Sequence, residues 1–117
     1  MQEYTVKVSD NRTEWFQNGE YHRIDGPACE YADGTKFWYQ NGKLHRMDAP
    51  ACEYKDGEKV WYQNGKRHRI DGPAVEYKSG NVEYWENGNK IPNPTKTKEM
   101  TVEQITKELG YNVKIVK

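Results

Sequence analysis

The sequence has no long apolar run. Nothing in its 117 residues approaches the ~20 apolar residues that a transmembrane helix needs, and the polar stretch 1–10 does not resemble a signal peptide. The 18 basic and 18 acidic residues cancel, which argues against long-range attraction to nucleic acid or anionic lipid. We therefore expect a cytoplasmic protein with neither a nucleic-acid nor a membrane partner.

Aliphatic residues are also scarce. Val, Ile, Leu and Phe together make up 17 of 117 residues, a fraction that by itself is typical of disordered chains. Against this, the chain has nil net charge and 9 Tyr, 4 Trp and 2 Phe. If there is a core, it is aromatic.

A repeat of 23 residues organises the chain. Asn-Gly occurs at 18–19, 41–42, 64–65 and 87–88, and other columns keep the same step. These columns are Trp15, Trp38, Trp61 and Tyr84; Phe16, Tyr39, Tyr62 and Trp85; His22-Arg23, His45-Arg46 and His68-Arg69; Asp25, Asp48 and Asp71; and Pro27, Pro50 and Pro73. Such a period is typical of stacked repeats.

Each unit reads as a β-hairpin. Pro-Ala-x-Glu-Tyr predicts a short strand, Asp-Gly or Ser-Gly a turn, and Lys-x-Trp-Tyr-Gln a second strand that ends at Asn-Gly. We expect an all-β fold, an antiparallel meander of about eight strands built from stacked hairpins. Because neighbouring strand residues point to opposite faces, Trp38 and Trp61 should lie on one face, and Tyr39 and Tyr62 on the other.

Two regions are expected, with repeats over 1–91 and a tail over 92–117. The tail begins as a polar linker over 92–100. Thr101 and Gln104 then suggest a capping box for a short helix over 102–109, which stops at Gly110. A last strand follows over 111–116. A two-turn helix is unstable alone, so we expect the tail to pack on the repeats.

The motif resembles that of MORN-type repeats. The matching residues are Trp15 to Gly19 and their equivalents, the histidines, and the turn glycines Gly34, Gly57 and Gly80. His-Arg-x-Asp-Gly-Pro-Ala replaces the usual His-Gly-x-Gly, a variant similar to small repeat proteins of bacteriophages and large DNA viruses. The resemblance implies a stacked β-hairpin fold.

Histidines and cysteines are expected to be structural. Equivalent atoms of adjacent repeats should lie about 9–10 Å apart, because each repeat adds two strands. That separation is too long for two histidines to share a zinc ion, and too long for Cys29 and Cys52 to form a disulfide. No Ser/His/Asp or Cys/His set and no phosphate loop stands out. We expect no enzyme activity, no metal and no cofactor.

The remaining candidates are arginines and aromatic rings. Arg23, Arg46 and Arg69 each precede an Asp by two residues, which favours a structural pair in every unit; a row that binds phosphate is the alternative. The aromatic columns form either an exposed protein-binding stripe or rings covered by Lys and Gln stems. The expected partner-binding residues are Trp38, Trp61, Tyr39, Tyr62, Arg46 and Arg69.

The function expected from the sequence is non-enzymatic binding. By analogy with other small viral proteins, we expect a phage-encoded inhibitor that blocks a host defence protein in the host cytoplasm. A trap for a nucleotide signal, using the arginines and aromatics, is the first alternative. A MORN-like scaffold at a membrane is the second, and self-association through sheet edges is a further expectation.

Overall fold

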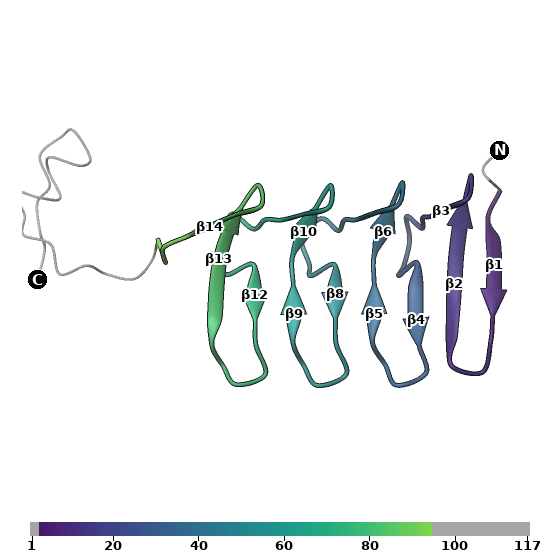
Figure 1. Cartoon of the computed structure of the whole chain (residues 1–117), viewed down its shortest axis with the longest axis horizontal. Coiled ribbons are helices and arrows are strands. Elements are labelled where there is room, and N and C mark those ends of the chain that lie inside the picture. The colour runs from purple at the N-terminus through teal and green to yellow at the C-terminus, as the bar shows by residue number, and fades with distance from the viewer. Residues whose placement is uncertain (1–2, 95–117) are drawn as a thin grey trace, which may run out of the picture.

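The computed structural model describes residues 3–94, which form strands and no helix (Figure 1). The strands are β1 Thr5–Val8, β2 Arg12–Gln17, β3 Glu20–Tyr21, β4 Cys29–Tyr31, β5 Lys36–Phe37, β6 Tyr39–Gln40, β7 Lys43–Leu44, β8 Cys52–Glu53, β9 Lys59–Val60, β10 Tyr62–Gln63, β11 Lys66–Arg67, β12 Val75–Glu76, β13 Val82–Glu86 and β14 Asn89–Ile91. The predicted helix over 102–109 and strand over 111–116 lie outside the described residues.

The hairpins stand side by side in one row from the first repeat to the last (Figure 1). A 10-stranded antiparallel sheet follows the order β1-β2-β4-β5-β8-β9-β12-β13-β14, and β3 pairs with β2. The pairs β6–β7 and β10–β11 form separate two-stranded ladders. Every strand pairs with a neighbour in the row, so the predicted all-β meander is confirmed.

The second strand of the inner repeats is divided at its Trp, which the sequence did not predict. The Trp38 N–H donates to the Ala51 carbonyl at 2.8 Å, whereas the Trp38 carbonyl accepts the His45 N–H at 3.0 Å. The pairing partner therefore changes at this residue. Strand β5, before Trp38, pairs with β8, whereas β6, after it, pairs with β7. Together with the short strands β3, β7, β11 and β14 that follow the Asn-Gly turns, this division gives residues 3–94 more and shorter strands than the eight expected.

Both turn types have the backbone shape that their residues favour. In the first Asn-Gly turn, φ is 53° at Asn18 and 78° at Gly19, the positive pair that a type I′ hairpin requires. At the opposite end of each hairpin, Gly34 has a φ of 98°. The preceding Asp33 side chain accepts the Thr35 N–H at 2.9 Å, an Asx interaction that holds the turn.

The core lies on one face of the sheet, here called the core face. Cys52, Val60 and Val75 are 2%, 7% and 2% exposed and form its centre. The flanking residues are Phe37, Leu44, Tyr62 and Trp85. The predicted division of the two aromatic columns between opposite faces agrees with this core, because Tyr62 and Trp85 pack against it, whereas Trp38 and Trp61 contact Arg46 and Arg69 instead.

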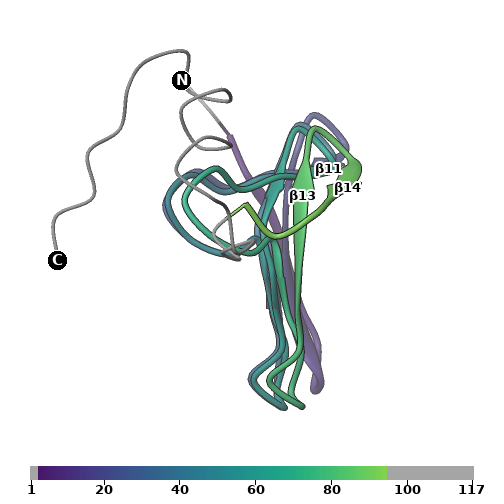
Figure 2. The same cartoon turned by 90° about the vertical axis from the view of Figure 1, so that its left-hand side faces the viewer.

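The opposite face carries three arcs, residues 22–28, 45–51 and 68–74, and is called the arc face. Each arc bulges away from the sheet (Figure 2) and is closed at both ends by one Trp. In the first arc the His22 N–H donates to the Trp15 carbonyl at 3.1 Å, and the Trp15 N–H donates to the Ala28 carbonyl at 2.7 Å. Ala28 is 0% exposed, so the last residue of this arc is buried against the sheet.

The two ends of the row are polar on the core face. Glu14 and Glu83 occupy the column that Phe37 and Val60 fill in the middle repeats. Glu14 accepts the Tyr21 hydroxyl. Glu83 accepts the Trp85 indole N–H at 3.0 Å. End repeats need such polar outer positions because they have only one neighbour.

Candidate binding surface

The three histidines join consecutive repeats. His22 Nδ1 accepts the backbone N–H of Asn41 at 2.9 Å, and His45 and His68 do the same for Asn64 and Asn87, each at 3.0 Å. This agrees with the structural role expected of the histidines, and each hydrogen bond runs to the turn of the next repeat. Within residues 3–94, no group of three or more His, Cys, Asp or Glu residues is placed to hold a metal ion.

Each arc arginine lies on the Trp that closes its arc. The guanidinium carbons of Arg23, Arg46 and Arg69 lie 3.9, 3.7 and 3.9 Å from the ring centroids of Trp15, Trp38 and Trp61. Stacking of this kind is a cation–π interaction. These three Trp rings are thus covered by guanidinium groups, whereas in the other aromatic column the Lys7 ammonium lies 5.0 Å from the ring centroid of Phe16.

The same arginines bind the backbone of their own arcs. Arg23 donates from Nη1 to the Pro27 carbonyl at 3.3 Å and from Nε to Asp25 at 3.2 Å. In the third arc, Arg69 pairs with Asp71 at 3.1 Å and with Glu76 at 3.3 Å. The predicted Arg–Asp pair is therefore confirmed in these two arcs.

The middle arc departs from this pattern. Arg46 pairs with Glu53 at 2.7 Å, and Asp48 has a φ of 64°. Ala49 stands where the other arcs have Gly26 and Gly72, and a Cβ on Gly26 would lie 2.8 Å from the guanidinium carbon of its arginine. The Ala49 methyl group excludes that arrangement, so the expectation of an Arg–Asp pair in every unit is wrong for this arc.

The six sequence-predicted binding residues fall on two faces. Trp38, Trp61, Arg46 and Arg69 form two stacks on the arc face. The Tyr39 ring lies 5.0 Å from that of Tyr21 on the core face. Tyr62 packs against the core there. All six side chains are partly buried, so neither column is an open stripe.

The most exposed apolar row was not anticipated from the sequence. Ile24, Met47 and Ile70 are 60%, 60% and 81% exposed, and they occupy the same position in the three arcs. We call this row the arc ridge. Its signal was present in the sequence, because the variable residue of His-Arg-x-Asp is apolar in every copy.

A groove separates the first two arcs. It is an open hollow of about 590 Å³ whose lining includes Ile24, Pro27, Trp38, Arg46 and Met47. The predicted residues Trp38 and Arg46 therefore meet the arc ridge at this point. A second hollow of about 830 Å³ lies near β13 and is lined largely by polar and charged residues, among them Glu58, Lys78 and Lys90.

The two cysteines are buried free thiols, as predicted. Burial raises the pKa of Cys52 to about 12 and also raises the pKa of Cys29. Both are therefore protonated near neutral pH, and a thiol is a far weaker nucleophile than a thiolate. Buried and protonated, both side chains are suited to a packing role in the core.

Between residues 3 and 94 the structure has no helix with the length and apolarity that a membrane span requires. No protein-family model, curated protein or solved structure matches the chain.

Proposed function

We propose that the protein is a non-enzymatic binding protein that docks on another protein through the arc ridge and the groove beside it. The observation that carries this proposal is the exposure of Ile24, Met47 and Ile70 at equivalent positions of three arcs. Contiguous exposed apolar rows are characteristic of interaction sites. The arcs are held at both ends by hydrogen bonds to Trp residues, so little ordering is needed on binding.

The charge around the arc ridge indicates the chemistry of the partner. The Asp25 and Asp71 side chains, each next to a ridge residue, are 84% and 86% exposed. A fitting partner surface is an apolar strip bordered by lysines or arginines, because charge complementarity guides specific encounter. Burial of each ridge side chain would contribute about 1.5–3 kcal/mol.

The narrower proposal is that the partner is a host protein and that binding blocks it in the host cytoplasm. A docking surface whose arcs are held at both ends suits stoichiometric inhibition, in which occupancy alone produces the effect. This step rests on the MORN-like motif and on analogy with small viral proteins.

A nucleotide trap is less well supported by the arc geometry. Arg23, Arg46 and Arg69 already stack on rings and pair with carboxylates and backbone carbonyls. A phosphate would have to displace those contacts. Calorimetry with cyclic nucleotides distinguishes the two functions, since tight binding without a protein partner would favour the trap.

The decisive experiment compares a ridge variant with a matched control. The variant carries Ile24→Ser, Met47→Ser and Ile70→Ser; the control carries Val8→Ser, a change on β1 at a residue 75% exposed. Both should melt like the wild type. We expect the wild type and the control to capture the same host protein and the ridge variant to lose it. Equal capture by all three would show that the arc ridge is not the interface.

Self-association through sheet edges is a separate proposal. Strand β1 is exposed along its length, and an unpaired edge can add a strand from another copy. Sedimentation of the wild type over a range of concentrations tests it, and a constant monomer mass would oppose it.

A further inference from the structure

The four Asn-Gly turns have nearly the same backbone shape. Asn18, Asn41, Asn64 and Asn87 have φ values of 53°, 52°, 52° and 50°. Asn-Gly is chemically labile because the glycine has no Cβ to hinder its nitrogen. That nitrogen loses its proton and attacks the Asn Cγ, the side-chain nitrogen leaves as ammonia, and water then opens the succinimide ring to aspartate or isoaspartate. The turns differ in how firmly they are held against this reaction.

The three later turns each form two hydrogen bonds to the preceding repeat. One is the bond from the Asn N–H to a histidine, already described for Asn41, Asn64 and Asn87. The other comes from the reacting nitrogen itself. The N–H groups of Gly42, Gly65 and Gly88 donate to the carbonyls of Tyr21, Leu44 and Arg67 at 2.9, 2.8 and 2.9 Å. Attack requires that this second bond break.

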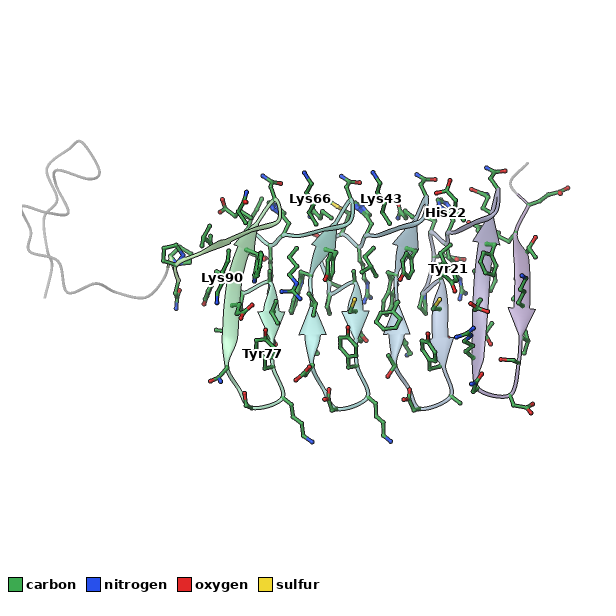
Figure 3. The ribbon with its side chains drawn as sticks, viewed as in Figure 1. Tyr21, His22, Lys43, Lys66, Tyr77 and Lys90 are labelled. Atoms are coloured by element: carbon green, nitrogen blue, oxygen red, sulfur yellow. The ribbon has the colours of Figure 1, made fainter. Side chains whose placement is uncertain are left out.

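The first turn has neither bond, because no arc precedes it. Within residues 3–94, no hydrogen bond from the N–H of Asn18 or Gly19 to an earlier repeat is present. The space around the turn glycine also differs between the first turn and the later ones. A Cβ on Gly19 would meet nothing within 4 Å, whereas one on Gly65 would lie 3.6 Å from Lys43 and one on Gly88 3.6 Å from Lys66. Lys43 and Lys66 lie along the edge of the sheet that carries these turns (Figure 3).

We infer that Asn18 is a selective deamidation site of the folded protein, and that the stack of repeats protects the other three asparagines. Less support means more frequent local opening, which the reaction needs. Isoaspartate adds a methylene to the backbone and breaks the type I′ shape. The change would act on β3, whose Tyr21 binds Glu14 and contacts the ring of Tyr39. The N-terminal end of the sheet would therefore loosen first with age.

Peptide mapping by mass spectrometry tests the inference within one molecule. The folded full chain is incubated in mildly alkaline buffer, and conversion is followed at all four asparagines. We expect Asn18 to react about tenfold faster than the other three asparagines. Loss of hydrogen bonds of ordinary strength makes local opening of the turn more frequent by about this factor. In denaturant the four rates should converge. A folded protein in which Asn18 reacts no faster than Asn41, Asn64 or Asn87 overturns the inference.

A variant tests the cause. His45→Ala removes the acceptor of the Asn64 N–H, and the half-buried position makes it milder than the same change at buried His22. Asn64 should then react faster, whereas Asn87, held by His68, keeps its rate. No change at Asn64 in a folded variant would contradict protection by this bond. If the variant unfolds, as circular dichroism would reveal, the order of the wild-type rates still decides.

Discussion

The guanidinium carbon of Arg46 lies 3.7 Å from the ring centroid of Trp38. The same guanidinium group donates hydrogen bonds to the Pro50 carbonyl at 3.1 Å and to the Glu53 carboxylate at 2.7 Å. One side chain thus joins the sheet, the arc and the following strand. This stacking explains how the arc face is covered although it has few aliphatic residues. The guanidinium group covers the Trp ring, as a side chain from a second sheet or a helix would do in other folds.

Trp38→Ala should destabilise the fold. Removal of the ring deprives Arg46 of its stacking surface and leaves the middle arc without support, so we expect the free energy of unfolding to fall by about 2–4 kcal/mol. Urea unfolding measures this. Ile24→Ser is the control and should stay within about 0.5 kcal/mol of the wild type. A Trp38→Ala protein that melts normally but loses its partner would instead make the ring a surface binding residue.

His45→Ala should weaken the contact between the second and third repeats. The variant leaves the Asn64 N–H without its acceptor, at a cost of about 1 kcal/mol in the free energy of unfolding. His45→Asn places an oxygen near the position of Nδ1 and should recover part of that loss. Equal stability of the two variants would show that the hydrogen bond contributes nothing.

Gly26→Ala should disturb the first arc through steric contact. The added Cβ would lie 2.8 Å from the Arg23 guanidinium carbon, and we expect a loss of about 1–3 kcal/mol. Gly72→Ala, with the same 2.8 Å approach to Arg69, should behave alike. The measurement is the melting temperature of both variants. Melting temperatures equal to that of the wild type would mean that the first and third arcs adopt the conformation of the middle arc without loss of stability.

Stability should fall at alkaline pH because of Cys52. Burial raises its pKa from 9.0 to about 12, so above pH 9.0 the unfolded chain loses this proton before the folded one does. The stabilising contribution is complete below pH 9.0 and declines as the pH rises toward 12. Tyr54, whose pKa burial also raises to about 12, acts in the same direction from its ordinary value of 10.0.

Urea unfolding between pH 8 and 11 checks this on the wild type and on Cys52→Val. Valine already fills the equivalent position at Val75, so the variant should fold. We expect a smaller decline in stability with pH in Cys52→Val, with the remainder due to Cys29 and to tyrosines such as Tyr39 and Tyr54, whose pKa values are also raised. The same slope in both proteins would contradict the assignment to the thiol.

Local chemistry made much of this fold predictable. The period of 23 residues, the Asn-Gly turns at positive φ and the opposite faces of neighbours such as Trp38 and Tyr39 follow from the chain itself, because turn preference and strand alternation act over a few residues. The free thiols of Cys29 and Cys52 follow equally, since the strand spacing is the same in all sheets.

The course of the arcs required the tertiary structure. Whether Ile24 or Met47 is exposed depends on the path between His and Ala, and this path is set by hydrogen bonds to a distant Trp rather than by local preference. The histidine contacts join residues 19 positions apart, which no local pattern encodes. Among the three arcs, the Arg–Asp pair is missing only where Ala49 replaces glycine, and the consequence of that one methyl group is visible only in the folded arc. The sequence by itself determined which residues share a face, and packing between repeats decided which of them are covered.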